Sequence, residues 1–177
     1  MTGKTHIAGG AAAGACVGFA LHLPINQLLV CCAAGGIGGL IPDLDASRSI
    51  ITSRTGIVGA TVSHVARHRG ILHTPLIYVI LNYMLWAVLF RGVSISHTET
   101  IALSGLFAGE ISHLFLDSLN HIGIMWLWPY PKRFSVLHVS SHGVLNTMLR
   151  YLFTAVCVSI VFLSCCMYDS IVIRPLC

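Results

Sequence analysis

Long, mostly uncharged apolar tracts recur from one end of this chain to the other and limit its fold more than any other feature. A helix needs roughly 17 to 25 largely apolar residues to cross a bilayer, and several tracts approach or reach that length. They cover residues 6–23, 25–41, 72–90, 98–119 and 151–168. Only 9% of the residues are charged, whereas soluble domains carry roughly a quarter. We therefore expect an all-α fold, a polytopic membrane helical bundle with about five transmembrane helices, forming a single domain over residues 1–177.

Glycine spacing in the first tract indicates close helix packing. Gly10, Gly14 and Gly18 repeat every four residues, which places them on one helix face where a neighbouring backbone can approach. The start of the chain, with Lys4 before an apolar stretch, also resembles a cleaved signal sequence, but the stretch is glycine-rich and lacks a clear cleavage site. We expect this tract to remain as a packed membrane helix.

Charge and cysteine usage exclude other classes of protein. The net charge of +4 is scattered along the chain, without the dense Lys/Arg stripe that neutralises many phosphates, so we expect no nucleic-acid partner. The seven cysteines lie in apolar tracts or at the terminus without a C-x-x-C pair, and we expect buried small apolar residues rather than a disulfide or zinc framework. Membrane lipid is the partner that the composition favours. The aromatic residues between 126 and 130 fit the boundary between membrane and water.

Basic residues favour one side of the membrane. If five helices alternate in direction, the amino terminus and the connectors 43–70 and 120–150 share one side. Eight of the ten basic residues fall there, namely Lys4, Arg48, Arg54, Arg67, Arg69, Lys132, Arg133 and Arg150. Because cytoplasmic loops carry the excess of Lys and Arg, we expect this side, and with it the amino terminus, to be cytoplasmic.

Polar residues near the ends of the predicted helices converge on that same side. Each lies at the start or end of an apolar tract or in a connector between tracts. These residues are His6, Asp43, Asp45, His68, His73, His113 and Asp117. Chance placement would scatter them over both membrane faces, so we expect one site built by four helices.

Imidazoles and carboxylates together favour a divalent metal. In the fourth tract, Glu110, His113 and Asp117 are spaced i, i+3 and i+7, which stacks them on one helix face. Ionisable groups inside a transmembrane tract are costly unless they are paired or bound to a metal, so they are candidates for function. Asp43 and Asp45 follow a helix-ending proline, where two carboxylates can turn inward together.

The connector before the third tract places histidines beside arginines. His68 and His73 offer imidazoles, and Arg67 and Arg69 suit an anionic substrate group such as a phosphate. A basic loop near a cytoplasmic membrane surface also sets topology or contacts lipid headgroups, and this alternative stays open. The sequence leaves open whether further histidines join the site, namely His121, His138 and His142.

Four motifs in order resemble a known family. They are Thr5-His6 followed by glycines, Gly39-Leu40-Ile41-Pro42-Asp43-Leu44-Asp45, His68-Arg69-Gly70-Ile71-Leu72-His73-Thr74, and Gly109-Glu110-Ile111-Ser112-His113-Leu114-Phe115-Leu116-Asp117. Over roughly residues 2 to 130 they look like the YdjM family of bacterial inner-membrane proteins, described as metal-dependent hydrolases of a LexA-regulated type. That family is regarded as distantly related to zinc-dependent phospholipases C and single-strand nucleases. The resemblance implies a multi-pass protein of the bacterial inner (cytoplasmic) membrane, with zinc as its metal and phosphate esters or phospholipids as substrates.

Our leading hypothesis is hydrolysis by a metal-activated water at the cytoplasmic membrane face. The metal would be held by His6, Asp45, His68, His73, His113 and Asp117. Asp43 or Glu110 would orient the water as a base, or Glu110 would support a ligand from behind. Two alternatives stay open, an ion, proton or metal transporter and a non-catalytic protein stabilised by a metal. Transport is disfavoured because transporter sites usually lie near the bilayer midplane.

Overall fold

The computed structural model is all-helical over the residues it describes, which are 1–45, 73–92, 96–137, 140 and 143–172. Five α-helices and one short 3-10 helix occur there, and no strand is found in these ranges. The helices are α1 (Gly3–Ala20), α2 (Ile25–Gly38), η1 (Ile41–Asp45), α5 (Pro75–Gly92), α6 (His97–Ser118) and α7 (Val144–Val172). The predicted helical class is therefore confirmed.

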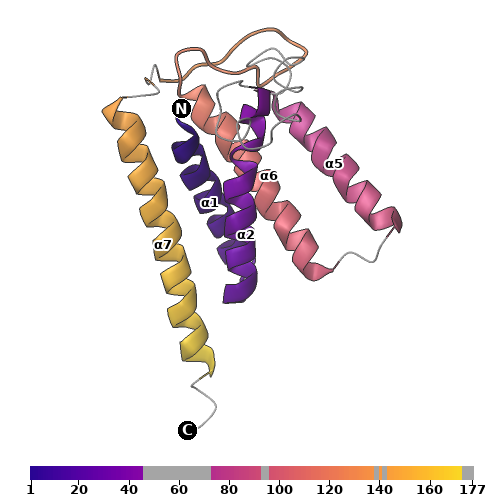
Figure 1. Cartoon of the computed structure of the whole chain (residues 1–177), viewed down its shortest axis with the longest axis vertical. Helices are drawn as coiled ribbons and strands as arrows, with labels where there is room; N and C mark the ends of the chain where they lie inside the picture. The colour runs from indigo at the N-terminus through magenta and orange to yellow at the C-terminus, as the bar shows by residue number, and fades with distance from the viewer. Residues whose placement is uncertain (46–72, 93–95, 138–139, 141–142, 173–177) are drawn as a thin grey trace.

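The helices alternate in direction. Figure 1 shows α1 leading away from the amino terminus, α2 returning, and α5, α6 and α7 continuing the alternation. The starts of α1, α5 and α7 and the ends of α2 and α6 thus lie at one end of the bundle. This is the arrangement that collects the polar residues predicted to converge.

Helices α1, α2 and α6 pack against one another in the bundle, and glycines bring α2 close to both of its neighbours. A Cβ at Gly10 of α1 would overlap the carbonyl of Gly35, and one at Gly109 of α6 would overlap the same carbonyl. A Cβ at Gly14 would overlap the backbone of Cys31. The predicted close approach at Gly10 and Gly14 is confirmed, and it lets three helices pack backbone to backbone.

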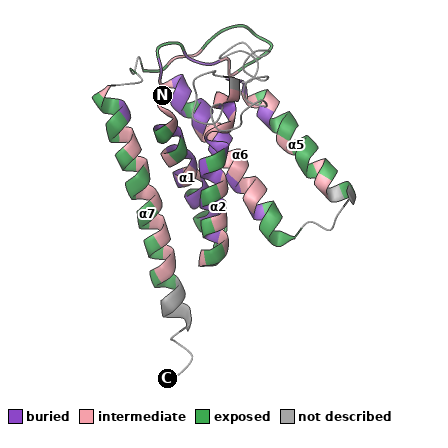
Figure 2. Ribbon diagram, in the orientation of Figure 1, coloured by how far each residue is buried: buried purple, intermediate pink, exposed green. Residues whose placement is uncertain are grey.

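Helices α5 and α7 form the periphery, and their outer faces are apolar and exposed (Figure 2). Val79, Met84 and Val88 of α5 and Leu152 and Phe162 of α7 are examples. No residue in the most apolar stretch within Val144–Met167 of α7 is buried inside the protein. Exposed apolar faces of this extent are expected where lipid, rather than water, surrounds a helix.

Two segments are long and apolar enough to cross a membrane, Ile25–Leu44 and Val144–Met167, and Pro75–Leu89 is apolar but shorter. The predicted five spans are therefore not reached by length and composition within the described residues. The reason lies in α1 and α6, which carry the polar residues of the site and are correspondingly less apolar. The fifth helix was also predicted too short: it begins at Val144 rather than 151, because helix continues through Asn146 and Arg150, which lower the local hydropathy.

Cysteine burial was predicted only in part. Cys31 and Cys32 are buried in α2, but Cys16 and Cys166 are exposed on the outer faces of α1 and α7. All six described cysteines are free thiols. Small apolar side chains are tolerated on these faces as well as in the core. Apolar neighbours in the sequence therefore do not distinguish a buried cysteine from an exposed one.

Candidate metal centre

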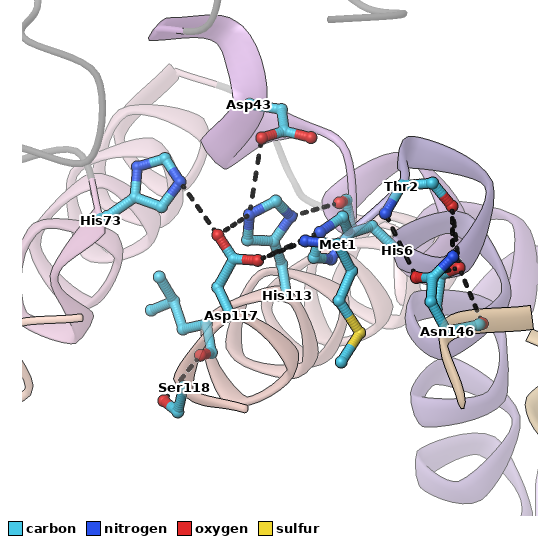
Figure 3. Close-up of polar contacts among 12 residues, drawn as sticks. Met1, Thr2, His6, Asp43, His73, His113, Asp117, Ser118 and Asn146 are labelled. Atoms are coloured by element: carbon cyan, nitrogen blue, oxygen red, sulfur yellow. Dashed lines mark hydrogen bonds and ion pairs between the residues drawn. The ribbon is translucent and has the colours of Figure 1, made fainter. Parts of the chain in front are cut away.

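Three imidazoles and two carboxylates meet at the bundle end where α1 begins and α6 ends (Figure 3). They come from α1 (His6), η1 (Asp43), the residue two before α5 (His73) and the last turns of α6 (His113 and Asp117). His6, Asp43 and His113 form one triad of donor atoms within 4.8 Å of one another, and His73, His113 and Asp117 form another. The two triads share His113, so they make one continuous cluster.

Asp117 lies at the centre of this cluster. Its Oδ1 is 3.4 Å from Nε2 of His6, and its Oδ2 is 3.8 Å from Nε2 of both His73 and His113. The Met1 ammonium lies 2.9 Å from Oδ1 of Asp117 and supplies it with a positive charge. One carboxylate therefore faces three imidazoles and a cation.

His113 is held in the tautomer that a metal ligand needs. Its Nδ1 lies 2.8 Å from the backbone carbonyl of Gly39, and because a carbonyl only accepts, the neutral ring donates from Nδ1. Nε2 then keeps its lone pair, 3.9 Å from Oδ1 of Asp43 and 3.8 Å from Oδ2 of Asp117. A carbonyl behind the ring is a common support for a metal-binding histidine.

The cluster is almost fully enclosed. His6, His73, His113 and Asp117 are at most 1% exposed, whereas the side chain of Asp43 is 16% exposed. Both ring nitrogens of His6 and Nε2 of His113 make no hydrogen bond to the described residues. Leaving a buried polar atom in this state costs roughly 1 to 3 kcal/mol, and a bound cation would remove that cost.

The donor spacing also suits one small cation. Zinc binds imidazole nitrogen and carboxylate oxygen at about 2.0 to 2.2 Å, which in a tetrahedral arrangement separates two donors by about 3.4 Å. The distances from Asp117 to the three imidazoles and from Asp43 to His113 run from 3.4 to 3.9 Å. The residues present therefore fit a divalent metal, with the open side of the site at Asp43.

Helix geometry and close packing set these positions. His113 and Asp117 lie one turn apart on α6, and the far end of α6 is fixed by a capping box at Ser96. Gly39 lies so close to α1 that a Cβ there would overlap the carbonyl of His6. This contact brings the start of α1 and the end of α2 together, and with them the donors of α1 and η1.

Glu110 does not join the cluster. It lies almost one turn before His113, is 3% exposed, and accepts a hydrogen bond through Oε2 from the side-chain amide of Asn82 on α5. Asn82 also donates to the carbonyl of Tyr78, 2.9 Å away. Glu110 thus fastens α5 to α6 beneath the cluster, and its role as a base stays a prediction.

The remaining predicted residues are not placed with the cluster. Asp45 lies at the end of η1, but its side chain falls outside the described residues. The same holds for the whole of Arg67, His68, Arg69, His138 and His142. His121 is described and exposed, and it belongs to neither triad of donors.

A polar network that the sequence analysis missed joins α7 to the start of α1. Oδ1 of Asn146 accepts hydrogen bonds from the Thr5 hydroxyl at 3.0 Å and from the Thr2 backbone N–H at 3.3 Å. Its amide donates to Oγ1 of Thr2 at 3.2 Å. The sequence feature that could have indicated this network is an asparagine just before an apolar tract. Asn146 fixes Thr2 and Thr5, which precede His6 in the chain.

Comparisons with known proteins place the chain among bacterial membrane proteins. The sequence model of the family described as "YdjM inner membrane protein" matches residues 1–171. The chain is 34% identical over 129 residues to the uncharacterized protein YvsG of Bacillus subtilis (strain 168), covering 73% of this chain and 74% of that protein. It is 27% identical over 113 residues to the inner membrane protein YdjM of Escherichia coli (strain K12), covering 64% of this chain and 52% of that relative, about half its length. No solved structure matches.

Proposed function

The chain belongs to the YdjM inner membrane protein family, and from this premise we propose that it is a metal-dependent hydrolase working at the cytoplasmic face of the bacterial inner membrane. Its substrates are phosphate esters, phospholipids among them. All five helices cross the membrane in this proposal, and the cluster lies at their cytoplasmic end. The basic residues of the connectors support this orientation, since cytoplasmic loops carry the excess of Lys and Arg.

The observation that carries the proposal is the donor cluster. Segments far apart in sequence bring His6, His73 and His113 against Asp43 and Asp117 in an enclosed space. A purely structural polar network would be expected to complete its hydrogen bonds. Here His6 and His113 retain ring nitrogens without hydrogen-bond partners among the described residues, which supports a ligand role.

The side chains divide into two roles. His6, His73, His113 and Asp117 would hold the ion, and zinc suits this set of nitrogen and carboxylate donors. A metal bound there would lower the pKa of a coordinated water to about 7 and would polarise a phosphoryl oxygen. Asp43 is the partly exposed carboxylate at the rim, so its Oδ1 can orient an incoming water and take its proton.

The place of the cluster favours hydrolysis over transport. Transporter sites usually lie near the bilayer midplane, between halves of the protein. These donors instead lie where α1 begins and α6 ends, at one end of the bundle (Figure 1). A site at the membrane surface can be reached by substrates from water or from the lipid headgroup layer.

Metal analysis is the first test. The full chain is purified in detergent without chelator, and its metal content is measured by elemental mass spectrometry. We expect a stoichiometric amount of zinc. His113→Ala and Asp117→Asn should lose most of it. His121→Ala removes an exposed imidazole that follows Asp117 in the sequence, and it should keep the zinc content of the wild type. Wild-type protein that binds no divalent metal would end the proposal.

Activity is the second test. The zinc-loaded protein is assayed against phospholipids and soluble phosphate esters, with Asp117→Asn and His121→Ala alongside. We expect hydrolysis by the wild type and by His121→Ala, and none by Asp117→Asn. Stoichiometric zinc without hydrolysis of any phosphate ester would instead establish a metal that only ties the helices together.

A further inference from the structure

The loop between α6 and α7 lies at the end of the bundle where α1 begins (Figure 1), and several of its apolar side chains are exposed. Its tip contains Leu127, Trp128 and Tyr130, which are 62%, 36% and 60% exposed. Ile122, Val136 and Leu137 add further exposed apolar surface from the two sides of the loop. We call the stretch from Ile122 to Leu137 the apolar loop.

The apolar loop is fastened in place, so its exposed tip is a fixed feature. Ile124 and Phe134 exchange two backbone hydrogen bonds of 3.1 and 2.8 Å across it. Below the tip, the indole N–H of Trp126 donates to Oγ of Ser118 at 2.7 Å, and the N–H of Val136 donates to the carbonyl of Ser118 at 2.9 Å. The loop is therefore anchored to the residue that follows Asp117.

Two cations stand beside the apolar tip. Lys132 and Arg133 follow Tyr130 after one proline, and both are exposed. Trp and Tyr are enriched where the hydrocarbon of a membrane meets the headgroups, because their rings have an apolar body and a polar tip. Lys and Arg near that layer are attracted to anionic headgroups. Apolar side chains beside cations suit an anionic phospholipid surface better than water, because exposing apolar side chains to water is unfavourable.

We propose that the apolar loop is a binding element for anionic phospholipids, with Trp128 and Tyr130 at the boundary of the acyl chains and Lys132 and Arg133 at the lipid phosphates. The occupant is lipid because the outward faces of α5 and α7 are themselves apolar. The apolar loop lies at the end of the bundle where α5 and α7 begin (Figure 1). This inference goes beyond the proposed hydrolysis and holds with or without a metal.

Fluorescence of Trp128 provides a local test. The full chain has three tryptophans, Trp86, Trp126 and Trp128. Trp86→Phe retains the loop pair, and Trp86→Phe with Trp128→Phe retains only the anchored Trp126, so the difference in emission reports Trp128 without disturbing the anchor. Both variants are reconstituted, metal-free, into vesicles that contain brominated phosphatidylglycerol or brominated phosphatidylcholine. We expect quenching of Trp128 by both lipids and stronger quenching by the anionic one.

Charge removal separates selective lipid binding from simple burial. In the Trp86→Phe background, Lys132→Gln with Arg133→Gln should abolish the excess quenching by phosphatidylglycerol, since each charge is worth about a fivefold enrichment of anionic lipid. Arg91→Gln is the control, because Arg91 is exposed at the opposite end of α5 and should leave the excess unchanged. Asp117→Asn should also leave it unchanged, because the proposed lipid-binding residues lie outside the donor cluster.

Three results would overturn the inference. Quenching of Trp128 by acrylamide but by neither brominated lipid would place the tip in water. Equal quenching by the two lipids in the wild-type loop would remove the anionic preference. Protection of Trp128 from acrylamide and from both lipids would mean that a second copy of the chain, or another protein, covers the tip.

Discussion

Alanine at Gly35 would test the backbone contact on which the whole arrangement of donors depends. A Cβ at this position would overlap the carbonyl of Gly10 and lie 3.1 Å from Cα of Gly14. Both obstacles are backbone atoms, which cannot rotate away as a flexible side chain can. Helices α1 and α2 would have to separate, and overfilling a packed interior costs about 1 to 3 kcal/mol.

Gly36 is the matched control because it is the next residue of the same helix. A Cβ there would meet nothing closer than 3.7 Å, at Ile7, which is ordinary van der Waals contact. Both substitutions gain helix propensity of about 1 kcal/mol, so this gain cancels in the comparison. We expect Gly35→Ala to be less stable than Gly36→Ala by about 1 to 3 kcal/mol in the free energy of unfolding.

The assay is unfolding in mixed detergent, followed by circular dichroism as the denaturing detergent is increased. A chelator is present so that metal binding does not contribute to the difference. Equal midpoints for Gly35→Ala and Gly36→Ala, or a higher one for Gly35→Ala, would refute the close approach of α1 and α2. It would also remove the reason for His6 and Asp43 to lie at one site.

Three further predictions concern the polar residues. Glu110→Gln should keep the zinc content of the wild type, because Glu110 bonds to Asn82 rather than to the cluster; zinc loss as large as that of Asp117→Asn would place it among the ligands after all. Asn146→Ala should lower the free energy of unfolding by about 1 to 3 kcal/mol, since Thr2 and Thr5 lose their partner on α7. An unchanged unfolding midpoint would show that other contacts hold α7 in place. Chelation should lower the thermal unfolding midpoint and zinc should restore it. A ligand present at a hundredfold its dissociation constant stabilises the folded state by about 2.7 kcal/mol. A midpoint that is unchanged by both treatments would contradict the metal centre.

Much of the site could be predicted because alternation of helices is a strong constraint. Once five tracts alternate, residues near their ends must fall at one end of the bundle or the other. His6, Asp43 and His113 are predicted to share one end in this way, and the structure brings their donor atoms within 4.8 Å of one another. The family resemblance of the four motifs is likewise confirmed over residues 1–171.

Distances along a helix explain what the sequence analysis could not resolve. Glu110 shares a helix face with His113 and Asp117, but a rise of 1.5 Å per residue places it about 10 Å below Asp117 along the axis. The pairing of Glu110 with Asn82 depends on the position of α5 relative to α6 along the helix axis. The spacing of residues within one helix does not determine that position. The extent of the membrane spans was also uncertain, because helices that carry site residues lose the hydropathy by which spans are recognised.

The most direct measurement of the central claim is X-ray absorption spectroscopy of zinc bound to the purified full chain. We expect nitrogen and oxygen neighbours at about 2.0 to 2.2 Å, with the outer-shell scattering of imidazole rings and a loss of that signal in His113→Ala. Sulfur neighbours at about 2.3 Å would contradict it, because they would show that cysteines, and not the cluster around Asp117, hold the metal.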